Sequence, residues 1–271
     1  QIRGLSDAFN QKVLFLLDGV PYWMSSNGDI PLLGIPIESI VKLEVIRGPG
    51  SVLYGTNASA GVINVITRQA KPLKKVFLSV GTQNKRSAGL YLNKSFKNSK
   101  VNVGLESFRE DGYTAQAFNA NNIVDFSCFC SKEDVDGDFE RFENYDRALV
   151  NYSINGLNMT FQAHQAETSR APDSTILNSG VYKQHGYMLA SDYRFEHNNL
   201  NYKVFADWNR FYYSLQDNDI NVLLGLDGDG EISFNNNGKN NTRYRLGIQT
   251  DFTFFNYFSL MGGFTHEDRS V

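Results

Sequence analysis

The chain has 271 residues, enough for one large domain or two smaller ones, and a formal net charge of −3 at pH 7. This slightly acidic balance argues against a nucleic-acid partner, and no apolar run is long enough for a membrane-spanning helix. With 20 Phe, 14 Tyr and only 6 Pro, the composition is typical of many β-strands joined by polar loops.

Residues 1–71 have the pattern of a compact region of short elements. Apolar runs at 13–20 (VLFLLDGV), 39–46 (SIVKLEVI) and 61–68 (GVINVITR) are separated by Gly, Pro, Ser and Asn. Helical periodicity is weak, so we expect a mixed α+β domain of short strands and turns. The run KPLKK at 71–75 is interpreted as a linker. We therefore predict one domain over 1–71 and a second over 72–271.

A glycine-rich turn after Arg47 raises the question of a phosphate site. A Walker loop needs Gly-Lys-Ser/Thr after its second glycine, and a dinucleotide fingerprint needs G-x-G-x-x-G with an acidic residue about twenty positions later. No such lysine follows here, the glycine spacing differs, and Thr67 and Arg68 stand where the acid would be. The sequence therefore argues against a nucleotide site.

From Lys74 onward, apolar and polar residues alternate with a period of two. In LNMTFQAHQ (157–165) the apolar face carries Leu157, Met159, Phe161 and Ala163, and the polar face carries Asn158, Thr160, Gln162 and His164. The run TRYRLGIQTDFTF (242–254) divides in the same way. Such alternation predicts sheets with one apolar and one polar face.

The connections between these strands indicate a barrel. Tight-turn signals stand at 98–99, 155–156, 198–199 and 255–256, and between them lie long polar segments at 111–144, 168–184 and 215–241. Nine strands fit, most of them ten residues or longer, with tight turns at one end and long loops at the other. That arrangement is typical of antiparallel transmembrane β-barrels. A soluble β-sandwich is the alternative, but its strands average about five or six residues.

The first region then resembles a known family. The segments IRGLSDAFNQKVLFLLDGVPY (Ile2–Tyr22) and IPIESIVKLEVIRGPGSVLYGTNASAGVINVITR (Ile35–Arg68) closely resemble the later part of the plug domain of TonB-dependent outer-membrane receptors. The rest of the chain is similar only in pattern, as the first nine or so strands of the family's barrel. We therefore expect a part of a longer protein: a plug followed by a partial barrel.

The resemblance implies a function in the outer membrane of a Gram-negative bacterium. Such receptors import a scarce nutrient, here an iron–siderophore complex as first choice, otherwise cobalamin, haem or an oligosaccharide. The implied partners are outer-membrane lipid and TonB with its proton-driven inner-membrane complex, which would act through a segment preceding Gln1. A passive porin or adhesin barrel is a further alternative, but a porin needs no plug.

The resemblance also implies a lock between plug and barrel. In this family, arginines of the I-R-G and E-V-I-R-G-P elements pair with glutamates on the barrel wall; carried over, these are Arg3 and Arg47, with Glu44 as a nearby acid on the same strand. A planar guanidinium suits facing carboxylates, and the partner strands are expected beyond Val271. The alternative is a buried ion pair without a gating role. We interpret the remaining motif residues as turn-forming rather than catalytic: Asp18, Gly19, Gly48, Pro49, Gly50, Gly55 and Gly61.

Two acidic loops are weaker candidates for Ca²⁺. Asp134, Asp136 and Asp138 lie in one predicted extracellular loop, and Asp227 and Asp229 lie in another. Carboxylate oxygens at such spacing can bind Ca²⁺, although neither run matches an EF-hand and both could simply be solvated. We expect no other cofactor.

The remaining reactive residues give no recognisable catalytic motif. Cys128 and Cys130 form C-x-C, whose single intervening residue would strain a disulfide. The four histidines do not cluster, and no Ser/His/Asp or Cys/His arrangement appears. We therefore do not predict an enzyme.

Overall fold

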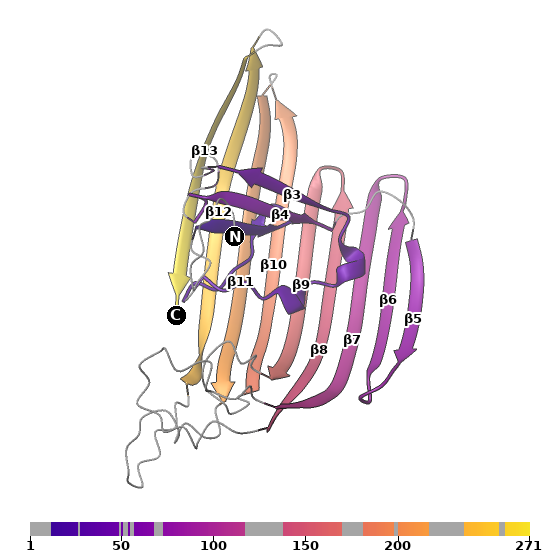
Figure 1. Ribbon diagram of the computed structural model, residues 1–271. Coiled ribbons are helices and arrows are strands. Elements are labelled where there is room, and N and C mark those ends of the chain that lie inside the picture. The colour runs from indigo at the N-terminus through magenta and orange to yellow at the C-terminus, as the bar shows by residue number, and fades with distance from the viewer. Residues whose placement is uncertain are drawn as a thin grey trace, which may run out of the picture.

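The structure is a computed structural model of the chain, and it describes residues 12–26, 28–48, 50, 54, 57–67, 73–116, 138–169, 181–197, 200–216, 236–254 and 258–271. Within these ranges the chain forms a small four-stranded sheet and a large nine-stranded sheet. The small sheet lies across one face of the large one (Figure 1). The apolar cluster described below lies where the two meet.

The small sheet has the strand order β2-β1-β4-β3. Its strands are β1 (Val13–Leu17), β2 (Val20–Pro21), β3 (Lys42–Arg47) and β4 (Gly61–Ile66). β1 pairs in parallel with β4. β1 is a continuous apolar run and β4 is apolar except for Asn64, as expected for strands that are largely covered on both faces. Two short 3-10 turns, η1 (Leu32–Gly34) and η2 (Ile37–Ser39), follow β2 and carry the chain along the large sheet.

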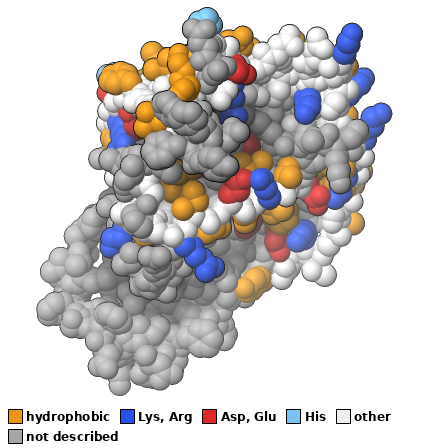
Figure 2. All heavy atoms as spheres, turned by 90° about the horizontal axis from the view of Figure 1, so that it is seen from above, with side chains coloured by type: hydrophobic (Ala, Val, Ile, Leu, Met, Phe, Trp, Pro, Cys, Tyr) orange, Lys and Arg blue, Asp and Glu red, His pale blue; other side chains and the backbone are white. Residues whose placement is uncertain are grey.

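The large sheet confirms the predicted nine-stranded antiparallel meander. Its strands pair in chain order. The tight turns at 96–98 and 155–156 lie at the upper end in Figure 1, the end that faces the viewer in Figure 2, whereas the short turn at 81–85 lies at the lower end. The strands are β5 (Leu73–Val80), β6 (Arg86–Ser95), β7 (Ser99–Gln116), β8 (Asp138–Ile154), β9 (Leu157–Ser169), β10 (Val181–His197), β11 (Leu200–Gln216), β12 (Asn236–Phe254) and β13 (Phe258–Ser270).

The period-two pattern decides which face of this sheet is covered. On β9, Thr160 and Gln162 are fully buried beneath the small sheet, while Met159 and Phe161 are 39% and 41% exposed. On β12, Arg243 is fully buried and Leu246 is 58% exposed. The polar face is therefore the inner one and the apolar face is the outer one, the reverse of a water-soluble sheet.

The predicted bounds of the long loops were wrong by several residues. β7 continues to Gln116 and β8 begins at Asp138, so that connection is shorter than the predicted 111–144. The other two long connections shorten in the same way, to 170–180 and 217–235. Backbone pairing continues beyond the last clear alternation of apolar and polar residues, so the side-chain pattern alone could not locate the strand ends. None of the helices in the described ranges is long and apolar enough to cross a membrane.

Candidate functional site

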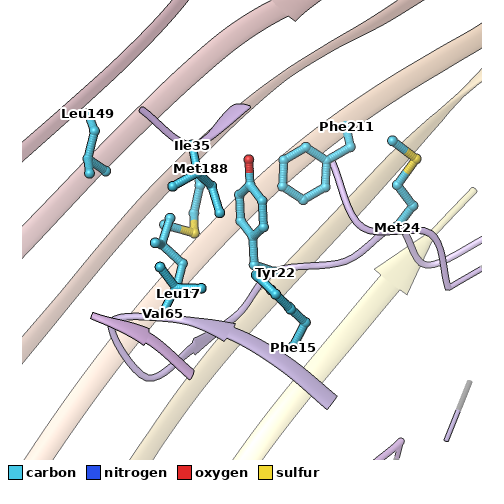
Figure 3. Close-up of a cluster of buried hydrophobic side chains, with 9 residues drawn as sticks. All are labelled: Phe15, Leu17, Tyr22, Met24, Ile35, Val65, Leu149, Met188 and Phe211. Atoms are coloured by element: carbon cyan, nitrogen blue, oxygen red, sulfur yellow. The ribbon is translucent and has the colours of Figure 1, made fainter. Parts of the chain in front are cut away.

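The contact between the two sheets is built around one apolar cluster (Figure 3). Leu149, Met188 and Phe211 reach it from β8, β10 and β11 of the large sheet. The ring of Tyr22 meets that of Phe211 edge-on, with 5.2 Å between centroids. The members from the first region are Phe15, Leu17, Tyr22, Met24, Ile35 and Val65. Three large apolar side chains on a mostly polar inner face thus mark where the small sheet docks.

Tyr22 combines this packing with one polar contact. Its side chain is fully buried, and its Oη donates a hydrogen bond to the carbonyl oxygen of Pro31 at 3.2 Å. Burial raises the pKa of Tyr22 far above its ordinary value, against a smaller opposing influence of the Arg147 guanidinium. The phenol therefore stays protonated and serves as a hydrogen-bond donor.

A buried hydrogen-bond chain joins the turn after β1 to the large sheet. The Asp18 carboxylate accepts the Thr67 backbone N–H at 2.9 Å and the Thr67 hydroxyl at 2.5 Å. The amide of Asn151 on β8 donates to Thr67 Oγ1 at 2.9 Å, and Thr160 on β9 donates to Asn151 Oδ1 at 2.8 Å. Thr67, Asn151 and Thr160 are each at most 1% exposed. We call these four residues the Asp18 chain.

A second branch runs from the same turn to the outer strand of the small sheet. The Gly19 backbone N–H donates to Asn64 Oδ1 at 2.9 Å, and Asn64 Nδ2 donates to Glu44 Oε2 at 3.0 Å. Lys42 lies 2.5 Å from Glu44 Oε1. Its hydrogen bond, and that of Asn64, lower the pKa of the exposed Glu44 carboxyl. The structure thus brings together three of the predicted residues: Asp18, Gly19 and Glu44.

The η1 turn is held to the large sheet by hydrogen bonds to its carbonyl oxygens, donated by Arg147 and Gln162. Arg147 Nη1 donates to Leu33 O at 3.3 Å, and Gln162 Nε2 donates to Gly34 O at 2.7 Å. The Arg147 guanidinium also forms a buried ion pair with Glu106 at 2.8 Å, the two side chains being 3% and 10% exposed. Tyr91 donates to the same carboxylate at 2.5 Å. The ion pair therefore fixes the arginine that holds the turn.

A second arginine, Arg243 on β12, holds the other end of this segment. Its Nη2 donates to the carbonyl oxygen of Pro21, and Asn209 Nδ2 lies 3.5 Å from the same oxygen. The Arg243 guanidinium lies 5.4 Å from the ring centroid of Trp23. Neighbouring Arg245 pairs with Asp207 at 2.7 Å. Besides the apolar cluster, the large sheet thus holds this segment through the backbone carbonyls of Pro21, Leu33 and Gly34.

The three predicted lock residues do not lie together in the described part of the structure. Arg47 is exposed on β3, opposite Gly61 in the strand pairing, and Arg3 lies outside the described residues. Glu44 contacts Lys42 and Asn64 of its own sheet. A lock between these residues and barrel carboxylates therefore stays a prediction.

The predicted turn residues are partly described. Asp18 and Gly19 have φ of +50° and +84°, and Gly48 has φ of +132°. A Cβ on Gly50 would lie 2.9 Å from Val62 Cγ2. Gly61 is buried at the start of β4. Pro49 and Gly55 lie outside the described residues.

The Ca²⁺ prediction also falls mainly outside the described residues. Asp134, Asp136, Asp227 and Asp229 lie there, as do Cys128 and Cys130, and Asp138 is described only in its backbone at the start of β8. In the part of the chain that the structure does describe, no group of three or more His, Cys, Asp or Glu could hold a metal ion. The Ca²⁺ site stays a prediction.

Sequence reasoning missed Arg147, Glu106 and Gln162 as contact residues. The signal for them was the polar face of the alternation, since a charged residue in mid-strand on that face must find a partner inside. Their acceptors on the η1 turn are backbone carbonyls, which have no sequence signature. The pairing could therefore not be read from the chain alone.

The comparisons with known proteins agree with this geometry. The family model of the TonB-dependent Receptor Plug Domain matches residues 1–62. The first region of the chain is thus a plug domain of the TonB-dependent receptor type. We therefore call residues 12–67 of the structure the plug and strands β5–β13 the wall. The receptor is a protein of the Gram-negative outer membrane, and its family is one of receptors and transporters rather than enzymes.

Two further similarities place the receptor among known proteins. A vitamin B12 transporter of Vibrio vulnificus is 40% identical over 102 residues, which are 37% of this chain and 16% of that protein. One of Vibrio cholerae is 27% identical over 154 residues, 56% of this chain and 22% of that protein. The chain thus matches less than a quarter of the length of these relatives.

Solved structures agree on the fold. The unliganded ferric citrate transporter FecA superposes with a TM-score of 0.62 at 16% identity, over 99% of this chain and 41% of that one. The siderophore receptor PirA of Acinetobacter baumannii gives 0.60 at 12% identity, over 95% and 40%. At such identities the likeness establishes the fold alone.

Proposed function

We propose that the complete receptor imports a scarce metal chelate across the outer membrane, with energy delivered by TonB and its proton-driven inner-membrane complex. The plug–wall contact carries this proposal. An apolar cluster, the Asp18 chain and two wall arginines hold the plug on the polar face of the wall. A plug held by so many buried contacts would not leave by thermal motion alone, so passage of a large solute would need an external source of energy.

An iron–siderophore complex is the cargo we propose first, following the family resemblance. Cobalamin is the second candidate, because the relative at 40% identity is a vitamin B12 transporter. That match covers 102 residues of this chain. Uptake of radiolabelled cobalamin and of ferric siderophores by cells that express the complete receptor as their only such transporter would separate the two. Haem or an oligosaccharide would be favoured if neither is taken up.

A cross-link between plug and wall tests the gating mechanism. Thr67→Cys and Asn151→Cys, with Cys128→Ser and Cys130→Ser in the complete receptor, place two thiols across the contact. A short bifunctional thiol reagent should abolish uptake while cargo binding remains, as should deletion of TonB. Each single-cysteine variant with the same reagent is the matched control. Full uptake by the cross-linked receptor, or in cells without TonB, would contradict the proposal.

We also propose that Arg47 forms part of a lock closed by barrel carboxylates, as the resemblance implies. Its exposure on β3 leaves the guanidinium accessible to such partners. In the complete receptor, Arg47→Ala should loosen the plug and raise passive permeability to large antibiotics, whereas Arg47→Lys should do so less, because a lysine keeps the charge but not the bidentate geometry. Unchanged permeability in Arg47→Ala would count against this role.

A further inference from the structure

The first three wall strands carry an unbalanced positive charge. Residues 73–105 contain Lys or Arg at seven positions and no Asp or Glu. Four of the lysines are exposed near the tight-turn end of β5–β7. Lys100 shares a strand face with the buried Asn102 and lies on the inner face; the other three are Lys74, Lys94 and Lys97. Figure 2, which looks onto that end, shows Lys and Arg side chains along the right-hand rim with no acidic side chain beside the outermost ones. We call these three residues the lysine rim.

Two of these lysines point outward. Lys74 pairs with Leu92 and Lys94 with Val101, and the neighbouring residue Asn93 is buried on the inner face. Successive side chains alternate across a strand, so Lys74 and Lys94 lie on the outer face. The same face carries Val76 and Leu78, which are 72% and 82% exposed. The lysines thus follow directly on the apolar surface toward the tight turns.

The lysine rim has no acidic partner in the described part of the chain. Neighbouring Lys75, which points inward, pairs with Glu38 of the plug at 2.9 Å. Lys94 instead places its Nζ 4.8 Å from the ring centroid of Phe96. An ammonium beside an aromatic ring at the edge of an apolar band is the arrangement of side chains that lie at the headgroup level of a bilayer.

We propose that Lys74, Lys94 and Lys97, with Phe96 beside them, bind the phosphate groups of anionic phospholipids in the periplasmic leaflet. In outer-membrane barrels the short turns are periplasmic, which places the lysine rim on that side. Clustered lysines at a membrane edge attract anionic headgroups. The lipid-binding proposal rests on the location of the receptor in the outer membrane and not on its cargo. If the proposed cargo is wrong, the lipid-binding proposal still stands, and the reverse also holds.

The lysine rim is confined to one sector of the wall. The next tight turn, at Asn155 and Gly156, lies in a stretch (148–166) with no Lys, Arg, Asp or Glu. The β10–β11 end carries both signs, with Arg194 beside Glu196. Anionic lipid should therefore be held at β5–β7 rather than evenly around the wall.

The experiment uses the complete receptor in vesicles of phosphatidylethanolamine with or without one-fifth phosphatidylglycerol. The first readout is the phosphatidylglycerol retained per receptor after extraction at increasing salt; the second is the acetylation rate of each lysine. The test variant is Lys74→Gln/Lys94→Gln/Lys97→Gln. The matched control, Lys85→Gln/Arg86→Gln/Lys183→Gln, removes the same charge from the part of the wall nearer the long loops.

Wild type and the control variant should retain phosphatidylglycerol above its fraction in the vesicles. The test variant should lose this enrichment, because each lysine removed should lower the affinity for phosphatidylglycerol roughly fivefold at low salt. Acetylation of the lysine rim should slow only when phosphatidylglycerol is present. Equal retention by the test variant would overturn the proposal. Protection that appears with inorganic phosphate alone, or that requires soluble periplasmic protein, would overturn it as well.

Discussion

The plug sheet and the wall are both built of β-strands, but they bury opposite kinds of side chain. β1 and β4 of the plug bury apolar side chains such as Leu16, Leu17 and Val62. The wall exposes its apolar face and buries Asn151, Thr160 and Gln162 beneath the plug. A sheet places its apolar face against its least polar surroundings; for the plug these are its own core, and for the wall they are lipid.

This difference means that the plug–wall contact is largely polar. Packing at the apolar cluster is joined by buried hydrogen bonds, each of which leaves a costly unsatisfied group if its partner is removed. Contacts of this kind require a specific geometry, and removing one partner also destabilises the group that it leaves unsatisfied. The variants below separate the two regions by the size of the effect on the complete receptor.

The largest effect should come from the buried wall ion pair. Glu106→Ala leaves Arg147 as an uncompensated buried charge and removes the acceptor of Tyr91, which should lower the free energy of unfolding by about 3–5 kcal/mol. Glu167→Ala, which breaks a half-exposed pair with Lys183 on the same wall, should cost less than about 1 kcal/mol. Denaturant unfolding in lipid vesicles measures both. Similar losses for the two variants would show that the Glu106 pair is not desolvated.

The next effect concerns the close approach of η1 to the wall. A Cβ on Gly34 would lie 2.7 Å from both Gln162 Nε2 and His164 Nδ1, so Gly34→Ala should cost about 1–3 kcal/mol through overpacking. The control is Gly262→Ala on β13, where a Cβ meets nothing within 4 Å. Thermal unfolding of the complete receptor would show the difference. A neutral Gly34→Ala would mean that η1 can move away from the wall without loss.

A smaller effect is expected along the Asp18 chain. Thr67→Val keeps the shape and the backbone hydrogen bond to Asp18 but removes the hydroxyl that donates to Asp18 and accepts from Asn151, which should cost about 1–3 kcal/mol. Asn151→Leu breaks the same contact from the wall side. The double variant should therefore cost less than the sum of the two, with a coupling of about 0.5–3 kcal/mol. Strict additivity would show that Thr67 and Asn151 are not energetically linked.

The two regions also differ in how far their sequence predicts them. The period-two alternation from Lys74 onward predicted nine wall strands, their order and the identity of each face, because one residue of slip would turn every side chain over. The alternation could not locate where β7 ends or where β12 begins, since backbone pairing continues beyond the last clear alternation of apolar and polar residues. The parallel pairing of β1 with β4 also has no local signal, because 43 residues separate them along the chain.

The contact site was predicted least. Asp18, Gly19 and Glu44 were chosen from motif similarity. The structure links Gly19 to Glu44 through Asn64, which was not chosen as a site residue. Arg147 and Arg243 bind backbone carbonyls of Leu33 and Pro21, and any residue type offers a carbonyl. Contacts between two side chains can be predicted in part from residue type, whereas contacts to the backbone depend on where the fold places the chain.

The smallest effect concerns Glu44, at the exposed end of the hydrogen bonds that join Gly19, Asn64 and Glu44 in the plug. Hydrogen bonds from Lys42 and Asn64 hold the pKa of Glu44 below its ordinary value, so its carboxylate stabilises the folded plug above the unfolded pKa of about 4.3. That contribution is lost as the pH falls through the lower, folded pKa. The stability difference between wild type and Glu44→Gln should therefore be present at neutral pH and vanish in strong acid. A difference that stays constant across this range would place the ionised Glu44 outside the network, and the plug edge would then depend on strand pairing alone.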